Sequence, residues 1–108
     1  MAGTSHKVSR ALFKEVFVGG RSTHSASFTL KKTVKPNSLT LFSVVVSAKV
    51  AKKAVKRNLI KRRIRAALVE LKSSIQPGSV IIVFTKPSIV SMSYTEIKKQ
   101  LDTSLRSL

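Results

Sequence analysis

The chain has 108 residues, no cysteine, and 21 lysines and arginines against four acids, which gives a formal net charge of +17. This length suits one domain, and the 43% hydrophobic content excludes a disordered polycation. The lack of cysteine excludes disulfides, thiolate metal sites and a cysteine nucleophile. A folded body this basic repels itself unless it binds a polyanion, so nucleic acid is the leading partner and an anionic membrane surface the second.

The N-terminal segment predicts a loose basic tail and then a short helix. Residues 1–8 lack the apolar core of a signal peptide, so we expect a single cytoplasmic domain over residues 1–108. The stretch SRALFKEVFVGG places four apolar side chains on one helical face, Leu12, Phe13, Val16 and Phe17. The pair Gly19-Gly20 ends this helix. Core packing is the default interpretation of the two phenylalanines, and a stacking platform for bases is the alternative.

Two strands of a hairpin are predicted next. In SASFTLKKTV, Phe28 and Leu30 alternate with polar residues, which is typical of a half-buried strand. The sequence KPNS at residues 35–38 is a turn signal. The β-branched run LTLFSVVVSA is the second and more buried strand of the hairpin. The β-strand pattern between Phe28 and Val46 is compatible with either two or three strands.

A basic helix follows in the stretch AKKAVKRNLIKRRIRAALVELKSSIQPG. Five apolar side chains fall within an arc of roughly 100° on a helical wheel, namely Ile60, Ile64, Ala67, Leu68 and Leu71. The six basic residues of KRNLIKRRIR, residues 56–65, therefore lie on the exposed side of a helix anchored in the core. Beside the buried face runs a polar strip made of Arg57, Asn58, Lys61, Arg62 and Arg65.

The polar strip indicates contact with several consecutive phosphates. Arginine offers forked donors to a phosphate, and lysine offers a point charge. Asn58 adds no charge, but its amide both donates and accepts, so it can bond a base edge, a ribose hydroxyl or a neighbouring arginine. A merely solvated face is the plain alternative, and it is disfavoured because no acid lies between Arg21 and Ala67.

The C-terminal third predicts one strand and one helix. Pro77-Gly78 breaks the chain, and the continuous apolar run SVIIVFT indicates a strand buried on both faces. Ser93 and Glu96 stand at capping-box spacing, ahead of the apolar stripe Tyr94, Ile97, Leu101 and Leu105. The predicted order is α-β-β-β-α-β-α. This is an α+β fold, a mixed α/β sandwich whose sheet is packed on at least one side by helices.

Neither catalysis nor metal binding is expected from these side chains alone. His6 and His24 fall in the predicted tail and a predicted loop, without a second ligand at suitable spacing. The acids are scattered, so neither a metal site nor an acid/base pair is predicted; they are Glu15, Glu70, Glu96 and Asp102. We therefore expect no catalytic residue and no cofactor held by the protein alone.

The segment VSAKVAKKAVKRNLIKRRIRAAL, residues 46–68, resembles the signature of the bacterial ribonuclease P protein subunit. In that family a strand leads into a basic helix centred on an Arg-Asn-Arg triplet, followed by a Lys-Arg pair and a later Arg. Here Arg57-Asn58, Lys61-Arg62 and Arg65 match those positions. The stretches FKEVFVGGRS, SFTL, GSVIIVFTKP and SYTEIKKQL are similar to the other blocks of the family, in the family's order.

The resemblance implies a monomeric protein within a ribonucleoprotein, bound to ribonuclease P RNA. That RNA, with its Mg²⁺ ions, cuts the 5′ leader from precursor tRNA. The implied RNA-binding residues are Lys53, Arg57, Asn58, Lys61, Arg62 and Arg65. The implied leader-binding cleft holds Phe13, Phe17, Thr29, Lys31 and Lys49. The family's β-α-β crossover around the basic helix is left-handed, whereas the residues alone predict the common right-handed one.

Two positions depart from the family pattern. Leu59 stands where the triplet has its second arginine, and it joins Val55 and Ala66 on a second, weakly apolar strip. Arg63 offers a replacement charge but projects roughly 40° further round the helix. Lys31 stands where many relatives have an aromatic residue, so this cleft is expected to depend there more on charge than on stacking.

Three other functions compete with this interpretation. A basic ribosomal or general RNA-binding protein would have the same size and charge, although the order of the motifs argues against it. A membrane-surface module would need bulky apolar residues, preferably tryptophan, beside the basic face, and the chain has no tryptophan. A protein-only nuclease is disfavoured by the shortage of acids.

Overall fold

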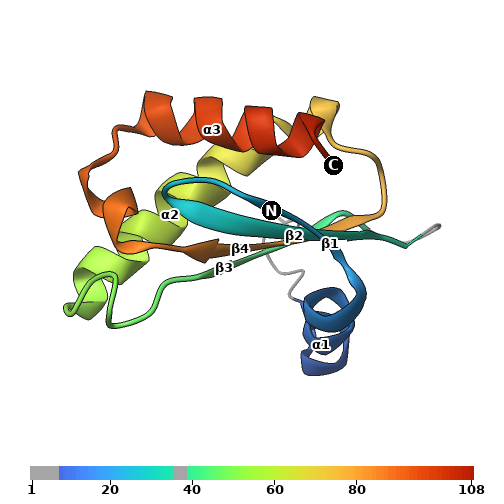
Figure 1. Cartoon of the computed structure of the whole chain (residues 1–108), viewed down its shortest axis with the longest axis horizontal. Helices are drawn as coiled ribbons and strands as arrows, with labels where there is room; N and C mark the ends of the chain where they lie inside the picture. The colour runs from blue at the N-terminus through green and yellow to red at the C-terminus, as the bar shows by residue number, and fades with distance from the viewer. Residues whose placement is uncertain (1–7, 36–38) are drawn as a thin grey trace.

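The computed structural model describes residues 8–35 and 39–108 and contains three α-helices and one four-stranded sheet. The elements in chain order are α1 (Arg10–Gly19), β1 (Arg21–His24), β2 (Phe28–Val34), β3 (Leu41–Val45), α2 (Ala54–Glu70), η2 (Lys72–Ser74), β4 (Ser79–Thr85), η3 (Pro87–Ser91) and α3 (Tyr94–Arg106). Helices α2 and α3 cover one face of the sheet and α1 lies against the other (Figure 1). The predicted α+β fold and element order are confirmed.

The predicted hairpin between the segments around Phe28 and Val44 is wrong. The strand order is β1-β2-β4-β3, so β4 separates β2 from β3, and the antiparallel hairpin partner of β2 is β1. The sequence Arg-Ser-Thr-His of β1 is mostly exposed and carries no apolar alternation, which is why it looked like a loop. The predicted turn at residues 35–38 and the predicted tail lie largely outside the described residues.

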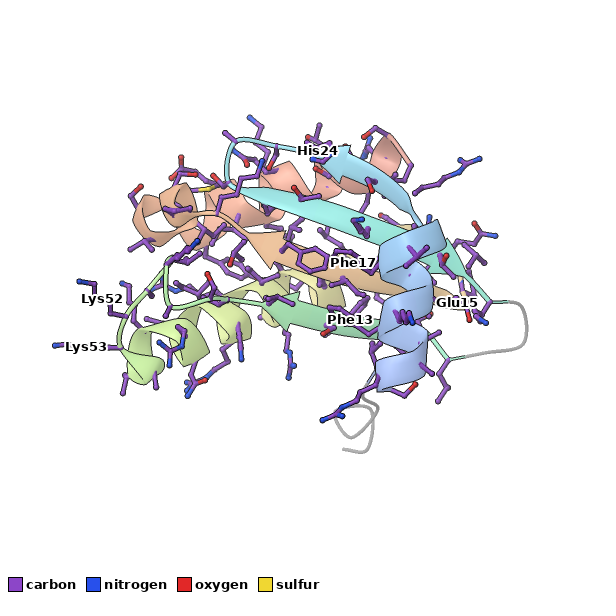
Figure 2. All side chains as sticks on the ribbon, turned by 60° about the horizontal axis from the view of Figure 1, so that its bottom comes forward. Phe13, Glu15, Phe17, His24, Lys52 and Lys53 are labelled. Carbon is purple, nitrogen blue, oxygen red and sulfur yellow. The ribbon has the colours of Figure 1, made fainter. Side chains whose placement is uncertain are left out.

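The β3–α2–β4 connection is left-handed. Strands β3 and β4 are parallel neighbours. In Figure 2, seen from the α1 side, both run in one direction, β4 lies on the β2 side of β3, and α2 lies behind the sheet. This is the rare hand for such a crossover, so the hand that the resemblance implied is found and the one predicted from the residues alone is wrong.

Strand β4 forms the centre of the core, as its continuous apolar run predicted. Ile81 and Val83 pack toward α2 and α3, while Val80 and Ile82 pack with Val16 of α1 on the opposite face. All five apolar side chains predicted for the inner face of α2 are buried, namely Ile60, Ile64, Ala67, Leu68 and Leu71. The capping box at the start of α3 is also present: Ser93 Oγ accepts from the Glu96 N–H, and Glu96 Oε1 accepts from the Ser93 N–H.

Gly20 brings the end of α1 close to the sheet. A Cβ atom at this position would lie 2.5 Å from the carbonyl oxygen of Val16 and 3.0 Å from that of Lys32. Both neighbours are backbone atoms and cannot move aside easily, so the close approach of α1 to β2 requires glycine. This contact holds α1 over one part of the sheet and sets where its phenylalanines project.

Candidate nucleic-acid interface

Helix α2 presents most of the predicted polar strip to solvent because its opposite face is anchored in the core. Ile60 and Ile64 are 2% and 0% exposed. On the outer side, Asn58, Arg62 and Arg65 are exposed, and Lys61 is half-buried. Lys53, which precedes the helix, is exposed and points away from the body (Figure 2).

All four acids of the chain are engaged away from this strip. Three form ion pairs: Glu15 with Lys35 at 2.6 Å, Glu70 with Lys98 at 2.6 Å, and Asp102 with Arg106 at 3.3 Å. The fourth, Glu96, caps α3. The hydrogen bond from Lys98 lowers the pKa of Glu70, and the hydrogen bonds from Ser93 lower the pKa of Glu96. Within the described residues, no ion pair therefore neutralises the polar strip.

Arg57 differs from the other members of the polar strip because it is tied to the backbone. Its Nη1 atom donates to the carbonyl oxygens of Ala51 and Lys52, at 2.9 and 2.6 Å. These bonds join the first turn of α2 to the segment that leads into it. Helix α2 has no side-chain cap and no acid in its first turn. The hydrogen bonds of Arg57 therefore stabilise the start of the helix in place of a cap.

We predict that Arg57→Ala loosens the entry to α2 more than it removes a phosphate contact. Amide hydrogen exchange at residues 50–53 should rise, while the dependence of RNA affinity on salt should change little. In the comparison variant Arg62→Ala, the exchange rates should stay as they are, and the slope of log K against log salt should fall by about one. An equal fall of the slope in both variants would instead assign Arg57 to a phosphate.

Three phenylalanines form a cluster on the face of the sheet that α1 only partly covers. The rings of Phe13 and Phe17 are stacked at 6.4 Å, and each meets the ring of Phe84 edge-on, at 5.9 and 5.7 Å. Phe17 is 49% exposed, and Figure 2 shows it with Phe13 projecting from α1 over the sheet. Phe17 thus packs against Phe13 and Phe84 and also exposes part of its ring to solvent. Sequence reasoning missed Phe84, although its alternation with Ile82 places it on this face.

The other predicted cleft residues on the sheet adjoin this cluster. Lys31 Nζ donates to the Phe17 carbonyl oxygen at 2.8 Å and lies 4.3 Å from the centre of the Phe17 ring, a cation–π contact. Thr29 Oγ1 lies 3.1 Å from Nδ1 of His24, which is the last residue of β1 rather than part of a loop. Lys49 is exposed in the turn after β3. The structure therefore brings Phe13, Phe17, Thr29 and Lys31 to one face of the sheet.

A hollow of about 550 Å³ lies elsewhere, between β1 and α3. Its lining mixes an acid with bases and hydroxyls: Thr23, His24, Ser25, Glu96, Lys99, Gln100, Thr103, Ser104 and Ser107. This mixed lining contains an acid, whereas the polar strip of α2 contains none. The candidate nucleic-acid interface is therefore an exposed surface of helix, sheet and turn rather than this hollow.

Comparison with known proteins identifies the group to which this arrangement belongs. The family model described as Ribonuclease P matches residues 4–108, nearly the whole chain. The chain belongs to the ribonuclease P protein family. The ribonuclease P protein component of Geobacillus kaustophilus is 39% identical over 95 residues, which cover 87% of this chain and 78% of that protein. The one from Ligilactobacillus salivarius is 32% identical over 103 residues, covering 94% and 91%.

Solved ribonuclease P proteins share this fold. The Staphylococcus aureus ribonuclease P protein superposes with a TM-score of 0.80 at 27% identity, covering 92% of this chain and 90% of that one. The Thermotoga maritima protein gives a TM-score of 0.84 at 21% identity, covering 95% and 97%, and supports the fold alone. Family membership places this chain in tRNA processing, as the protein component of ribonuclease P.

Residues 8–35 and 39–108 contain no group of three or more histidine, cysteine or acidic side chains placed to hold a metal ion. In the same ranges, no helix is long and apolar enough to cross a membrane. The Mg²⁺ that the resemblance implied in the complex with RNA stays a prediction.

Proposed function

We propose that this ribonuclease P protein binds ribonuclease P RNA and the 5′ leader of precursor tRNA, and so assists endonucleolytic removal of the leader. The observation that carries the proposal is the unneutralised polar strip on α2 in a chain of this family. Catalysis belongs to the RNA subunit. The protein contributes positive charge and surfaces that orient the substrate.

The proposal assigns different RNAs to two surfaces. The exposed cations of α2 bind the phosphates of the RNA subunit, together with Lys53, while Asn58 bonds a ribose or a base edge. Bases of the single-stranded leader stack on the half-exposed ring of Phe17. Lys31 lies beside that ring and supplies a charge for the adjoining phosphate. Thr29 and Lys49 extend this leader-binding surface.

Magnesium belongs to the RNA in this proposal. The acids of the protein are paired or used as a cap, so phosphates and RNA groups would hold the ions. Protein cations spread over the same phosphates reduce the concentration of Mg²⁺ that the complex requires. The protein acts as a monomer in a cytoplasmic ribonucleoprotein.

A processing assay at low Mg²⁺ tests the proposal. Precursor tRNA and a bacterial ribonuclease P RNA are incubated with and without this protein. We expect cleavage at the mature 5′ end only when protein and RNA are both present. If the protein binds the RNA but never restores cleavage, the alternative of a basic ribosomal or general RNA-binding protein takes its place, and association with ribosomes is the next measurement.

Phe17→Ala tests the leader-binding surface. Stacking of one base on an aromatic ring contributes roughly 1–3 kcal/mol, so affinity for precursor tRNA should fall about 5- to 150-fold. Affinity for mature tRNA should stay nearly constant, because mature tRNA has no leader. The neighbouring Val18→Ala, at a side chain that is 75% exposed, is the matched control and should affect neither. Equal losses for both RNAs, or a large fall in melting temperature, would assign Phe17 to packing alone.

A further inference from the structure

One solvent-facing line of side chains on α2 is largely apolar, although the helix is strongly basic. Val55 is 81% exposed and Val69 is 60% exposed. Ala66 is also exposed, and Leu59 is half-buried. We call these four residues the apolar ridge. A solvated basic helix gains nothing from valines at exposed positions, so this ridge needs an explanation beyond the fold.

The apolar ridge is straight and continuous except for one arginine. At 100° per residue its four members fall within an arc of about 80°, nearly opposite the core-facing Ile60 and Ile64. Val55 and Val69 are about 21 Å apart along the axis at 1.5 Å per residue. Arg62 stands within the same arc. Asn58 and Arg65 lie on one flank of the ridge, while Lys56 and Arg63 lie on the other.

The charges on both flanks decide which partner fits. A second copy of this chain would bring two bodies of charge +17 into contact, so self-association is disfavoured. A bilayer is disfavoured because the ridge has only short aliphatic side chains and no aromatic anchor. The partner must present a weakly polar band between two lines of negative charge. A single RNA strand offers one line of phosphates, whereas a double helix offers two.

We propose that the apolar ridge of α2 docks into the minor groove of an RNA double helix within the RNA subunit. The minor groove of A-form RNA is wide and shallow and is lined by riboses, whose C–H edges suit Val55, Leu59 and Val69. The flanking cations then reach the phosphates on both sides, and Asn58 meets a ribose hydroxyl. The minor groove of B-DNA, about 6 Å wide, is too narrow for a helix about 10–12 Å across.

This inference rests on the proposed function, because it specifies how α2 contacts the RNA subunit. It also accounts for Leu59, which replaces a charge by an aliphatic side chain in the middle of the basic segment. A helix that relied on charge alone would gain from an arginine at this position. A helix that inserts its apolar ridge into a groove gains from an aliphatic side chain, because burying it carries a smaller desolvation cost than burying a charge.

The test is the double variant Val55→Ser/Val69→Ser. Both valines are largely exposed, so folding should be retained, and melting curves verify this. Affinity for a bacterial ribonuclease P RNA should fall at least tenfold at every salt concentration, because roughly one to two buried methyl groups are lost at each position. The slope of log K against log salt should not change, since no charge is removed. Val18→Ser, another exposed valine, is the matched control and should bind like the parent protein.

A loop-free RNA duplex and a DNA duplex of the same sequence identify the groove. The parent protein should prefer the RNA duplex, and the double variant should lose that preference. An unchanged affinity of the double variant for the RNA subunit would overturn the proposal. An equal loss of affinity of the double variant for the RNA and the DNA duplex would also overturn it. Self-association of the parent protein that the two serine substitutions abolish would overturn it as well.

Leu59→Arg provides an independent check, because it introduces the arginine of the family triplet. We expect a steeper salt slope by about one, together with weaker binding than the parent at high salt, where charge is screened. Tighter binding at all salt concentrations would favour a purely electrostatic contact. Cleavage of precursor tRNA by the parent protein and RNA at low Mg²⁺ is measured in a separate assay. The groove proposal can therefore fail while the proposed function stands.

Discussion

Ile64→Ala should destabilise the free protein by about 2–5 kcal/mol, the usual range for removing most of a fully buried aliphatic side chain. Ile64 is 0% exposed and joins α2 to the core beneath the polar strip. Small domains are stable by only about 5–15 kcal/mol, and the net charge of +17 adds self-repulsion. Urea denaturation of the free protein should show the loss as a lower midpoint with an unchanged slope.

Val69→Ala is the control for this substitution. It shortens an aliphatic side chain on the same helix, but at a position that is 60% exposed, so stability should change by less than about 0.5 kcal/mol. RNA that binds only the folded protein stabilises the folded state. Saturating RNA should therefore restore much of the processing activity of Ile64→Ala. A similar loss in both variants would mean that α2 contributes little through its buried face.

The triple variant Lys61→Gln/Arg62→Gln/Arg65→Gln should have the largest effect on RNA binding. Each phosphate contact contributes about 0.7–0.9 to the slope of log K against log salt. Loss of three contacts should therefore reduce the slope by two to three, with the largest loss of affinity at low salt. Because these side chains are exposed or half-buried, the melting temperature should stay close to that of the parent. Filter binding to ribonuclease P RNA over a salt series measures the slope.

A second triple variant separates position from charge. Lys14→Gln/Lys72→Gln/Lys99→Gln removes the same three charges at exposed positions outside α2. Its salt slope should change by less than one. If both triple variants reduced the slope equally, the protein would attract RNA through its total charge, and α2 would not be the specific binding surface.

Elements with a strong local pattern were predictable from the sequence. The inner face of α2 follows from helical periodicity, β4 from an uninterrupted apolar run, and the start of α3 from the Ser93–Glu96 spacing. Strand β1 was not predictable, because its exposed polar residues are held by pairing with β2 rather than by burial. The placement of β4 between β2 and β3 was also missed, since pairings between distant segments leave no local signal.

The candidate site was predictable in composition but not in contacts. Spacing and family resemblance gave the residues of α2 and α1, yet nothing in the sequence showed that Arg57 bonds to the carbonyls of Ala51 and Lys52. Those bonds depend on the path of the chain into α2. The meeting of Phe84 with Phe13 and Phe17 likewise depends on how α1 crosses the sheet, and the close approach at Gly20 sets that crossing.

The central position of β4 has a consequence for biosynthesis. The ribosome makes β2 and β3 before β4. In the final sheet β2 and β3 do not pair with each other, because β4 lies between them. Until residues 79–85 emerge, the nascent chain has a β1–β2 hairpin, an unpaired β3 and a basic helix without a sheet to pack on. We therefore expect cooperative folding to begin late in translation, and a pulse of protease against stalled nascent chains should find protection only after β4 has left the exit tunnel.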